Sequence, residues 1–125
     1  MNLVEKRVLV IAPHPDDEIL GVGGTIAKCV DQGCTVVVLT ISGHLPPLYP
    51  EGVYAETVGE AHRAHEVVGV AESIFLDMPA TMLTDLPIHE LNGRILDVVS
   101  TVEPDVVFCP YPDRHVDHRV VFDSA

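Results

Sequence analysis

Four short apolar runs, rich in β-branched residues, alternate with longer segments of helical periodicity along this 125-residue chain. The runs are almost continuously apolar, which is typical of strands that are buried on both faces of a parallel sheet. We expect strands at residues 8–12, 35–42, 73–78 and 106–109, and helices at 21–32, 54–68 and 88–102. This alternation predicts an α/β fold with three layers, in which a mostly parallel sheet lies between two layers of helices.

Right-handed crossover connections favour a doubly wound sheet with the strand order 3-2-1-4. The chain contains no internal repeat, low-complexity tract or linker, so residues 1–125 are interpreted as one domain. In the second helix we expect Ala61, Ala64, Val67 and Val68 to face inward. The third helix has apolar residues at helical spacing: Leu91, Ile95, Leu96, Val98 and Val99.

Two loops rich in histidine and aspartate follow the first and the fourth predicted strands. The first is PHPDDE at residues 13–18, and the second is YPDRHVDH at residues 111–118. The order 3-2-1-4 makes these two strands neighbours. Ligands of doubly wound sheets bind at the carboxyl ends of the strands, where the winding reverses. We therefore expect the two loops to face each other across one crevice.

The adjacent carboxylates of Asp16, Asp17 and Glu18 need a compensating positive charge, because like charges repel and resist burial. A bound divalent metal ion would supply it. His14 and Asp17 are three residues apart on a turn that leads into a helix, so both side chains can reach one centre. With one imidazole from the second loop they would form three N/O ligands and an open fourth position, which suits catalytic zinc.

The remaining polar groups of the two loops suit acid–base chemistry. Asp16 is placed to take a proton from water at the metal. His115 is a candidate to protonate a leaving group, with Asp117 holding its ring. Glu18 is expected to face the N-terminus of the first helix, where its charge is favourable. Four further histidines are interpreted as surface or internally satisfied side chains: His44, His62, His65 and His89.

Each loop taken alone also has a purely structural interpretation. Asp-Asp-Glu before a helix is common as N-terminal capping and solvated surface, and His-x-Asp-His is common as loop polarity. The functional interpretation is favoured because the topology brings both loops to one edge of the sheet.

The charge balance argues against some partners. With 19 acidic and 7 basic residues the net charge is −12, which disfavours nucleic acid and anionic membrane surfaces. The three cysteines form no CxxC pair and fit buried apolar positions in a reducing cytoplasm. We expect neither a signal peptide nor a membrane-spanning helix, and a homo-oligomer is compatible with the sequence.

The motifs PHPDDE and His115-Val116-Asp117-His118, with this order of elements, resemble those of the LmbE-like, or PIG-L, zinc-dependent N-acetylglucosaminyl deacetylases. The resemblance extends over essentially the whole chain and includes VVVLTISGH as the second strand and its loop. It implies a Rossmann-like domain that hydrolyses the acetamide of a sugar. It also implies residue roles: zinc ligands His14, Asp17 and His118, general base Asp16, general acid or electrostatic stabiliser His115, and orienting partner Asp117.

Two positions depart from the family pattern. Many members carry an arginine in the second helix where this chain has Thr57, and Pro-Asp after the third strand where it has Pro79-Ala80. Both positions bear on how the substrate is held, so the identity of the sugar stays open. The family domain also looks longer than this chain, and residues 119–125 begin a helix whose apolar side needs a partner. We therefore expect a domain that is C-terminally incomplete.

These observations are interpreted as a zinc-dependent hydrolase that removes the N-acetyl group from an N-acetylglucosamine-type sugar in a glycoconjugate, nucleotide sugar or small glycoside. Another divalent metal such as Fe²⁺ would suit the same ligands. Two alternatives stay open: a metal-dependent amidohydrolase for another N-acyl substrate, and a non-catalytic binding module stabilised by the metal. A structural zinc site needs neither Asp16 nor His115, so their presence favours an enzyme.

Overall fold

The computed structural model describes residues 2–125, which contain a four-stranded sheet in the order β3-β2-β1-β4. All three strand pairs are parallel. The strands are β1 (Arg7–Ala12), β2 (Thr35–Gly43), β3 (Glu72–Pro79) and β4 (Val106–Phe108). The helices are α1 (Asp17–Asp31), α2 (Val53–Val68), α3 (Ile88–Val102) and α4 (Val116–Ser124), with a 3₁₀ turn, η1, at Leu83–Asp85. The predicted α/β fold and strand order 3-2-1-4 are confirmed.

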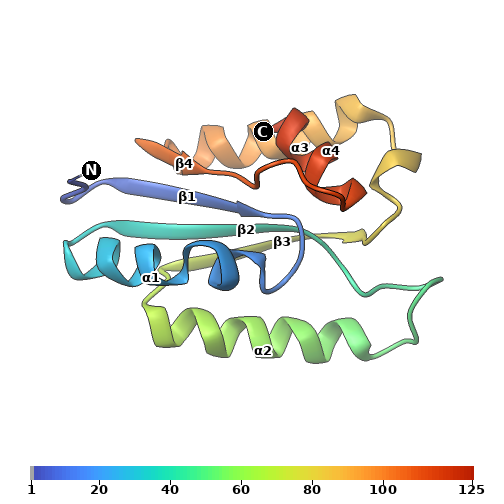
Figure 1. Ribbon diagram of the computed structural model, residues 1–125, viewed down its shortest axis with the longest axis horizontal. Coiled ribbons are helices and arrows are strands. Elements are labelled where there is room, and N and C mark those ends of the chain that lie inside the picture. Colours follow the sequence, from blue (N-terminus) through green and yellow to red (C-terminus); the bar gives the residue numbers. More distant parts are fainter. Residues whose placement is uncertain (1) are drawn as a thin grey trace.

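Helices cover both faces of the sheet. In Figure 1, α1 and α2 lie on one side of the strands, and α3 and α4 lie on the other. The predicted three-layer arrangement is therefore confirmed. Within residues 2–125, no helix combines the length and the apolar character that crossing a bilayer requires.

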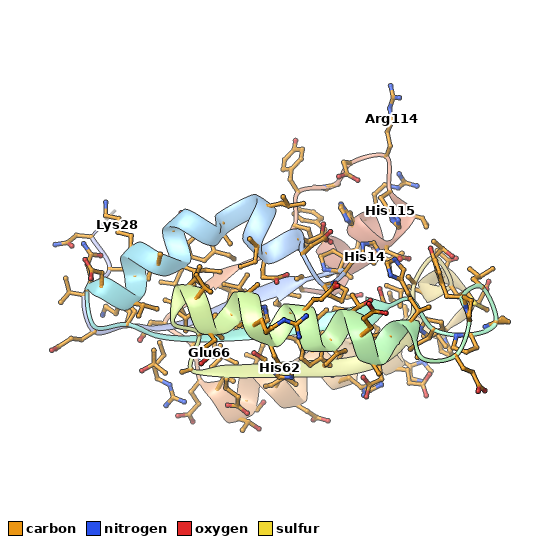
Figure 2. All side chains as sticks on the ribbon, turned by 90° about the horizontal axis from the view of Figure 1, so that it is seen from below. His14, Lys28, His62, Glu66, Arg114 and His115 are labelled. Carbon is orange, nitrogen blue, oxygen red and sulfur yellow. The ribbon has the colours of Figure 1, made fainter. Side chains whose placement is uncertain are left out.

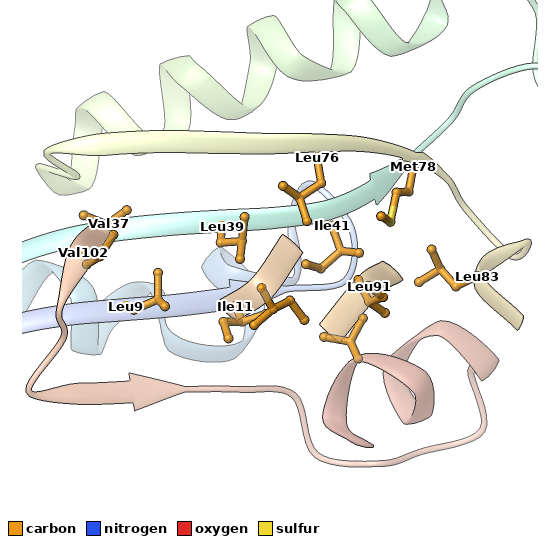
Figure 3. Packing of buried hydrophobic residues seen from close by; sticks show 12 residues of the cluster. Leu9, Ile11, Val37, Leu39, Ile41, Leu76, Met78, Leu83, Leu91 and Val102 are labelled. Carbon is orange, nitrogen blue, oxygen red and sulfur yellow. The ribbon is translucent and has the colours of Figure 1, made fainter. Parts of the chain in front are cut away.

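The buried side chains of the central strands alternate between two cores, because successive residues of a strand point to opposite faces. On β1, Leu9 and Ile11 pack in the cluster that contains residues of α3 and α4 (Figure 3). Val8 and Val10 belong to the cluster that contains residues of α1. The buried side chains of β2 alternate between the same two clusters. Burial on both faces is the physical reason why these strands read as continuous apolar runs.

Helix α1 begins earlier than the sequence predicts, at Asp17 instead of at residue 21. Asp17 and Glu18 lie in its first turn, where the helix dipole favours carboxylates. The glycines around Val22 mark a kink and not the start of the helix, since Val22 has the non-helical dihedrals φ −135° and ψ 18°.

Val67 on α2 was predicted to face inward but is 86% exposed, so that prediction is wrong. Leu96 on α3, which fits the helical spacing of apolar residues, is also exposed, at 62%. On α2 the buried stripe contains Ala61 and, four residues later, His65. A helix that covers a sheet buries only one stripe of its surface, and Val67 lies outside it.

The carboxyl ends of β1, β2 and β4 lie at one edge of the sheet. The register pairs Ala12 with Thr40 and Val10 with Phe108. The carbonyl of Pro13 accepts hydrogen bonds from the backbone N–H of Ser42 at 2.9 Å and from its hydroxyl at 2.7 Å. The loop after β1 is thus held against β2 and next to the loop that follows β4.

The two-sided core gives a direct test of the fold. Leu39 on β2 is fully buried, so we expect Leu39→Ala to lower the free energy of unfolding by about 2–5 kcal/mol. The matched control is Val67→Ala, which should change it by less than about 0.5 kcal/mol because the side chain is exposed. Equal effects of the two substitutions in urea denaturation would contradict this assignment of the core.

Candidate active site

His14 lies between two carboxylates where the first and last loops meet. Its Nε2 donates a 2.7 Å hydrogen bond to Oδ2 of Asp117, and its Nδ1 lies 3.2 Å from Oδ2 of Asp17. The backbone N–H of His14 also donates to Asp17 Oδ2, at 3.0 Å. The loop before α1 and the first turn of α4 are therefore in direct contact, as the strand order requires.

His118 joins this group from α4. Its Nε2 lies 3.2 Å from Oδ2 of Asp17, so one oxygen of Asp17 faces a nitrogen of each of two histidines. Two ligand atoms that are each about 2.0–2.1 Å from zinc, at the tetrahedral angle, stand roughly 3.3 Å apart. His14, Asp17 and His118 thus present the donor atoms and two of the spacings that a divalent metal needs.

The second ring nitrogen of each of these histidines is hydrogen-bonded to a carboxylate. Asp117 accepts from His14, and Asp113 accepts from Nδ1 of His118 at 2.8 Å. Metal-binding histidines usually donate their other N–H to a carboxylate, which fixes the ring and makes the ligating nitrogen more basic. Asp113 was missed at the sequence level. Its place in the HxDH loop, five residues before His118, is the signal that could have identified it.

The carboxylate of Asp117 contacts a different histidine from the one predicted. It is fully buried, and it accepts hydrogen bonds from His14 and from the backbone N–H of Thr81, the latter at 2.6 Å. Its expected partner, His115, instead accepts at Nδ1 from the backbone N–H of Asp117, at 3.1 Å. The cause is local, since His115 is the N-cap residue of α4 whereas the Asp117 side chain is buried inside the first turn.

The fit to a cation is supported by charge as well as by spacing. Oδ1 of Asp117 is buried and has no hydrogen-bond partner within the described residues. Together with the ionised Asp17, this leaves negative charge that a divalent cation would offset.

His115 completes a cluster of three histidines. Its ring centroid lies 4.5 Å from that of His14 and 5.0 Å from that of His118. One ligand atom from each of the three lies within 4.8 Å of the others, so a three-histidine ligand set competes with the set that contains Asp17. In Figure 2 His14 and His115 lie near each other, whereas the exposed Arg114 extends away from them.

Asp16 stands at the junction of two clefts. One has a volume of about 150 Å³, and its lining includes His14, Asp16, His44, Tyr49, Thr81 and His115. The other has a volume of about 340 Å³, lies between α1 and α2, and includes Asp16, Ile19, Thr57, Glu60, Ala61 and Ala64 in its lining. His44, Tyr49 and Thr81 are cleft residues that were missed at the sequence level. The position of His44, directly after β2, is the one signal that could have identified it.

The ionisable groups of the site differ in the direction of their pKa shifts. Burial, and then the charges of Asp17 and Glu18, raise the pKa of Asp16 above its usual 3.8. Burial opposes the ionisation of Asp17 and Asp117. Their interactions with His14, together with those of Asp17 with His118 and of Asp117 with the Thr81 backbone, outweigh it and hold both pKa values below the usual range. Burial would lower the pKa of His14, yet its hydrogen bonds to Asp117 and Asp17 raise that pKa to about 9.

Glu18 reaches the N-terminus of α1 with one oxygen only. Its Oε2 accepts a hydrogen bond from the backbone N–H of Asp16 at 3.2 Å, which agrees with the expected placement. Its Oε1 accepts from Nε2 of His65 at 2.8 Å. Helical spacing within α2 does not indicate this second contact, because His65 and Glu18 are 47 residues apart.

The family model described as PIG-L: GlcNAc-PI de-N-acetylase matches residues 9–125. The chain belongs to the PIG-L family. The resemblance that the PHPDDE and HxDH motifs suggested is therefore confirmed over nearly the whole chain.

Two curated relatives and one solved structure illustrate the similarity. The diacetylchitobiose deacetylase of Thermococcus kodakarensis is 34% identical over 91% of this chain and 45% of its own length. The 1D-myo-inositol 2-acetamido-2-deoxy-alpha-D-glucopyranoside deacetylase of Kineococcus radiotolerans is 30% identical over 96% and 44%. The N,N'-diacetylchitobiose deacetylase from Pyrococcus horikoshii, complexed with its inhibitor MPG, has a TM-score of 0.83 at 29% identity over 95% and 47%. The chain spans about half the length of these proteins.

The raised pKa of His14 predicts how the stability of the metal-free protein depends on pH. The stabilising contribution of protonated His14 is fully present below 6.5, the ordinary pKa, and is lost as the pH rises through the folded value of about 9. At 1.36 kcal/mol per pKa unit the full rise corresponds to about 3.4 kcal/mol, and solvent screening at this partly exposed ring lowers the expected loss to on the order of 2–3 kcal/mol.

Urea denaturation with a chelator present, at about pH 6 and about pH 9.5, measures this loss, and His14→Gln is the control that should remove most of it. A free energy of unfolding that falls equally in the wild type and the variant would contradict the assignment.

Proposed function

We propose that the protein is a zinc-dependent hydrolase that removes the N-acetyl group from an N-acetylglucosamine-type sugar. The observation that carries the proposal is the meeting of Asp17 Oδ2 with Nδ1 of His14 and Nε2 of His118, each at 3.2 Å, beside a cleft lined by Asp16. Membership of the PIG-L family supports the reaction class.

The zinc ligands in this proposal are His14, Asp17 and His118. When bound, the metal supplies Lewis acidity, which polarises an amide carbonyl and makes a water molecule more acidic. Fe²⁺ is a second candidate, because the same nitrogen and carboxylate ligands accept it. Asp117 and Asp113 hold the two histidine rings by their outer N–H groups.

Asp16 acts as the general base. It lines the cleft without making a hydrogen bond through its carboxylate to His14 or His118 among the described residues. The raised pKa makes its carboxylate a better proton acceptor than those of Asp17 and Asp117. Asp16 takes a proton from the water that attacks the carbonyl carbon of the acetamide. Two carboxylates in one loop thus take different roles because their environments differ.

His115 stabilises the tetrahedral intermediate with its neutral ring. Its Nδ1 accepts from the backbone N–H of Asp117, so the ring carries its proton on Nε2 and donates that N–H to the developing oxyanion. Asp16 passes the proton that it took from water to the nitrogen of the intermediate, the C–N bond breaks, and acetate and the free amine are formed. In this mechanism Asp117 orients His115 through its backbone and orients His14 through its carboxylate.

The two clefts favour an uncharged sugar. Within the described residues, neither cleft is lined by lysine or arginine, and the larger one contains the acidic Glu60. Thr57 and Ala80, the positions that depart from the family pattern, each line one of the clefts. Uncharged compounds are also named for two relatives, the deacetylases of diacetylchitobiose and of 1D-myo-inositol 2-acetamido-2-deoxy-alpha-D-glucopyranoside.

We propose that the protein is cytoplasmic, because its cysteines are not paired in disulfides. Cys29 and Cys34 are buried and Cys109 is exposed, and all three are free. Free thiols of this kind fit a reducing compartment.

Acetate release is the experiment that tests the function. The full-length protein is incubated with N-acetylglucosamine, N,N'-diacetylchitobiose and an N-acetylglucosaminyl inositol, with added Zn²⁺ or with a chelator. We expect release from at least one sugar that requires zinc. Release only from N-acyl compounds that are not sugars would favour the other amidohydrolase. No release from any of them by zinc-loaded protein would favour the non-catalytic module.

Metal content of variants separates the two possible ligand sets. We expect Asp17→Asn and His118→Ala to lower zinc affinity severely, because each removes a ligand. His115→Ala should keep about one zinc per chain while losing activity. Zinc lost in His115→Ala and kept in Asp17→Asn, measured by elemental analysis after dialysis, would support the three-histidine set instead.

The general-base role predicts a specific kinetic result for Asp16→Asn. The variant keeps the size of the side chain but not its basicity, so kcat should fall by roughly 10²–10⁴, the usual contribution of a general acid or base. Zinc content should be unchanged, since Asp16 is not a ligand. Near-normal turnover with zinc bound would refute the role and leave Asp16 as a residue of the helix N-terminus only.

A further inference from the structure

A chain of hydrogen bonds, buried at its centre, links α2 and β3 to the loop that carries Asp16. Nε2 of His65 donates to Oε1 of Glu18 at 2.8 Å, and Nδ1 of the same ring lies 2.6 Å from the hydroxyl oxygen of Ser73. The side chains of His65 and Glu18 are only 2% and 1% exposed. The proposed reaction uses neither residue, so their burial in a polar contact needs another explanation.

The other oxygen of Glu18 holds the backbone of Asp16. Oε2 accepts the Asp16 N–H at 3.2 Å. Asp16 has φ 144° and ψ −23°, a region that residues other than glycine rarely adopt. Strained backbone of this kind persists only where its surroundings hold it in place, and it concentrates at active sites. Here the carboxylate of Glu18 holds the backbone of Asp16 in place.

His65 in turn holds Glu18. A carboxylate removed from water is stable only when its oxygens are satisfied, and the two oxygens of Glu18 are divided between His65 and Asp16. Because His65 is also tied to Ser73 on β3, the position of the carboxylate is set by two elements outside its own helix. Loss of His65 would free Glu18 to move, and Asp16 would lose its backbone partner.

We propose that Glu18 and His65 are positioning residues, which hold the strained backbone of Asp16 so that its carboxylate faces the cleft. This inference rests on the proposed function, in which Asp16 is the general base. Because His65 lies on α2, a residue outside both the PHPDDE and the HxDH motif would help to position Asp16.

Steady-state kinetics of His65 variants test the role. His65→Leu should lower kcat by roughly 10–100-fold, the range seen when a supporting group is lost. KM and zinc content should change little. His65→Gln, which keeps an N–H donor, should recover most of the rate. The matched control is His62→Leu on the same helix (Figure 2), where an exposed histidine is replaced and kcat should stay unchanged.

A double-mutant cycle shows whether His65 acts through Asp16. In the Asp16→Asn background, adding His65→Leu should change kcat by less than about twofold, because the group being positioned is already gone. The same fold-loss in both backgrounds, or a loss carried by KM, would overturn the proposal. If His65→Leu does not fold, Glu18→Gln replaces it in the cycle, since an amide has one acceptor oxygen in place of two.

Hydrogen exchange separates this inference from the proposed function. The Asp16 amide, followed by NMR, should exchange at least roughly tenfold faster in His65→Leu than in the wild type, with protection restored in His65→Gln. This readout needs no turnover. Unchanged exchange would overturn the positioning role even in an active enzyme. Accelerated exchange in a protein that releases no acetate would leave the contact standing and reject the reaction.

Discussion

The hydrogen bond from His14 Nε2 to Asp117 Oδ2 is the contact on which the rest of the site depends. It is 2.7 Å long and joins residues that are 103 positions apart in the sequence. It can form because β4 pairs with β1 in parallel, which brings both carboxyl ends to one edge of the sheet. Without this pairing, His14 and Asp17 would lie in one loop and His118 in another, with no common centre.

Charge explains why this edge suits a metal and an acid–base reaction together. Ionised Asp17 and Asp117 are held in that form by His14. Asp16, one residue away, has a raised pKa because it is partly buried and because it is close to the carboxylates of Asp17 and Glu18. In the proposed mechanism two carboxylates of one short loop therefore take different roles, with Asp17 binding the cation and Asp16 accepting a proton, because their surroundings differ.

Apolar runs were sufficient to predict the four strands, because a strand buried on both faces is almost continuously apolar. The right-handed crossover rule then predicted their order and the two facing loops. Contacts between side chains of different elements were not predictable in the same way. The carboxylate of Asp117 lies against His14 and not His115, and His65 is buried against Glu18. Such pairs depend on the rotation of each helix about its axis. The exposure of Val67 and Leu96 shows that the spacing of apolar residues alone does not predict these rotations.

The central claim is that Asp17, with His14 and His118, holds one catalytic metal ion between the two loops. Anomalous diffraction at the zinc edge, from crystals of the zinc-loaded full-length protein, tests it most directly. We predict a single strong peak within about 2.0–2.2 Å of Asp17 Oδ2, His14 Nδ1 and His118 Nε2, with Asp117 still bonded to His14. A peak bound by His115 in place of Asp17, or no peak between the loops, would contradict the account.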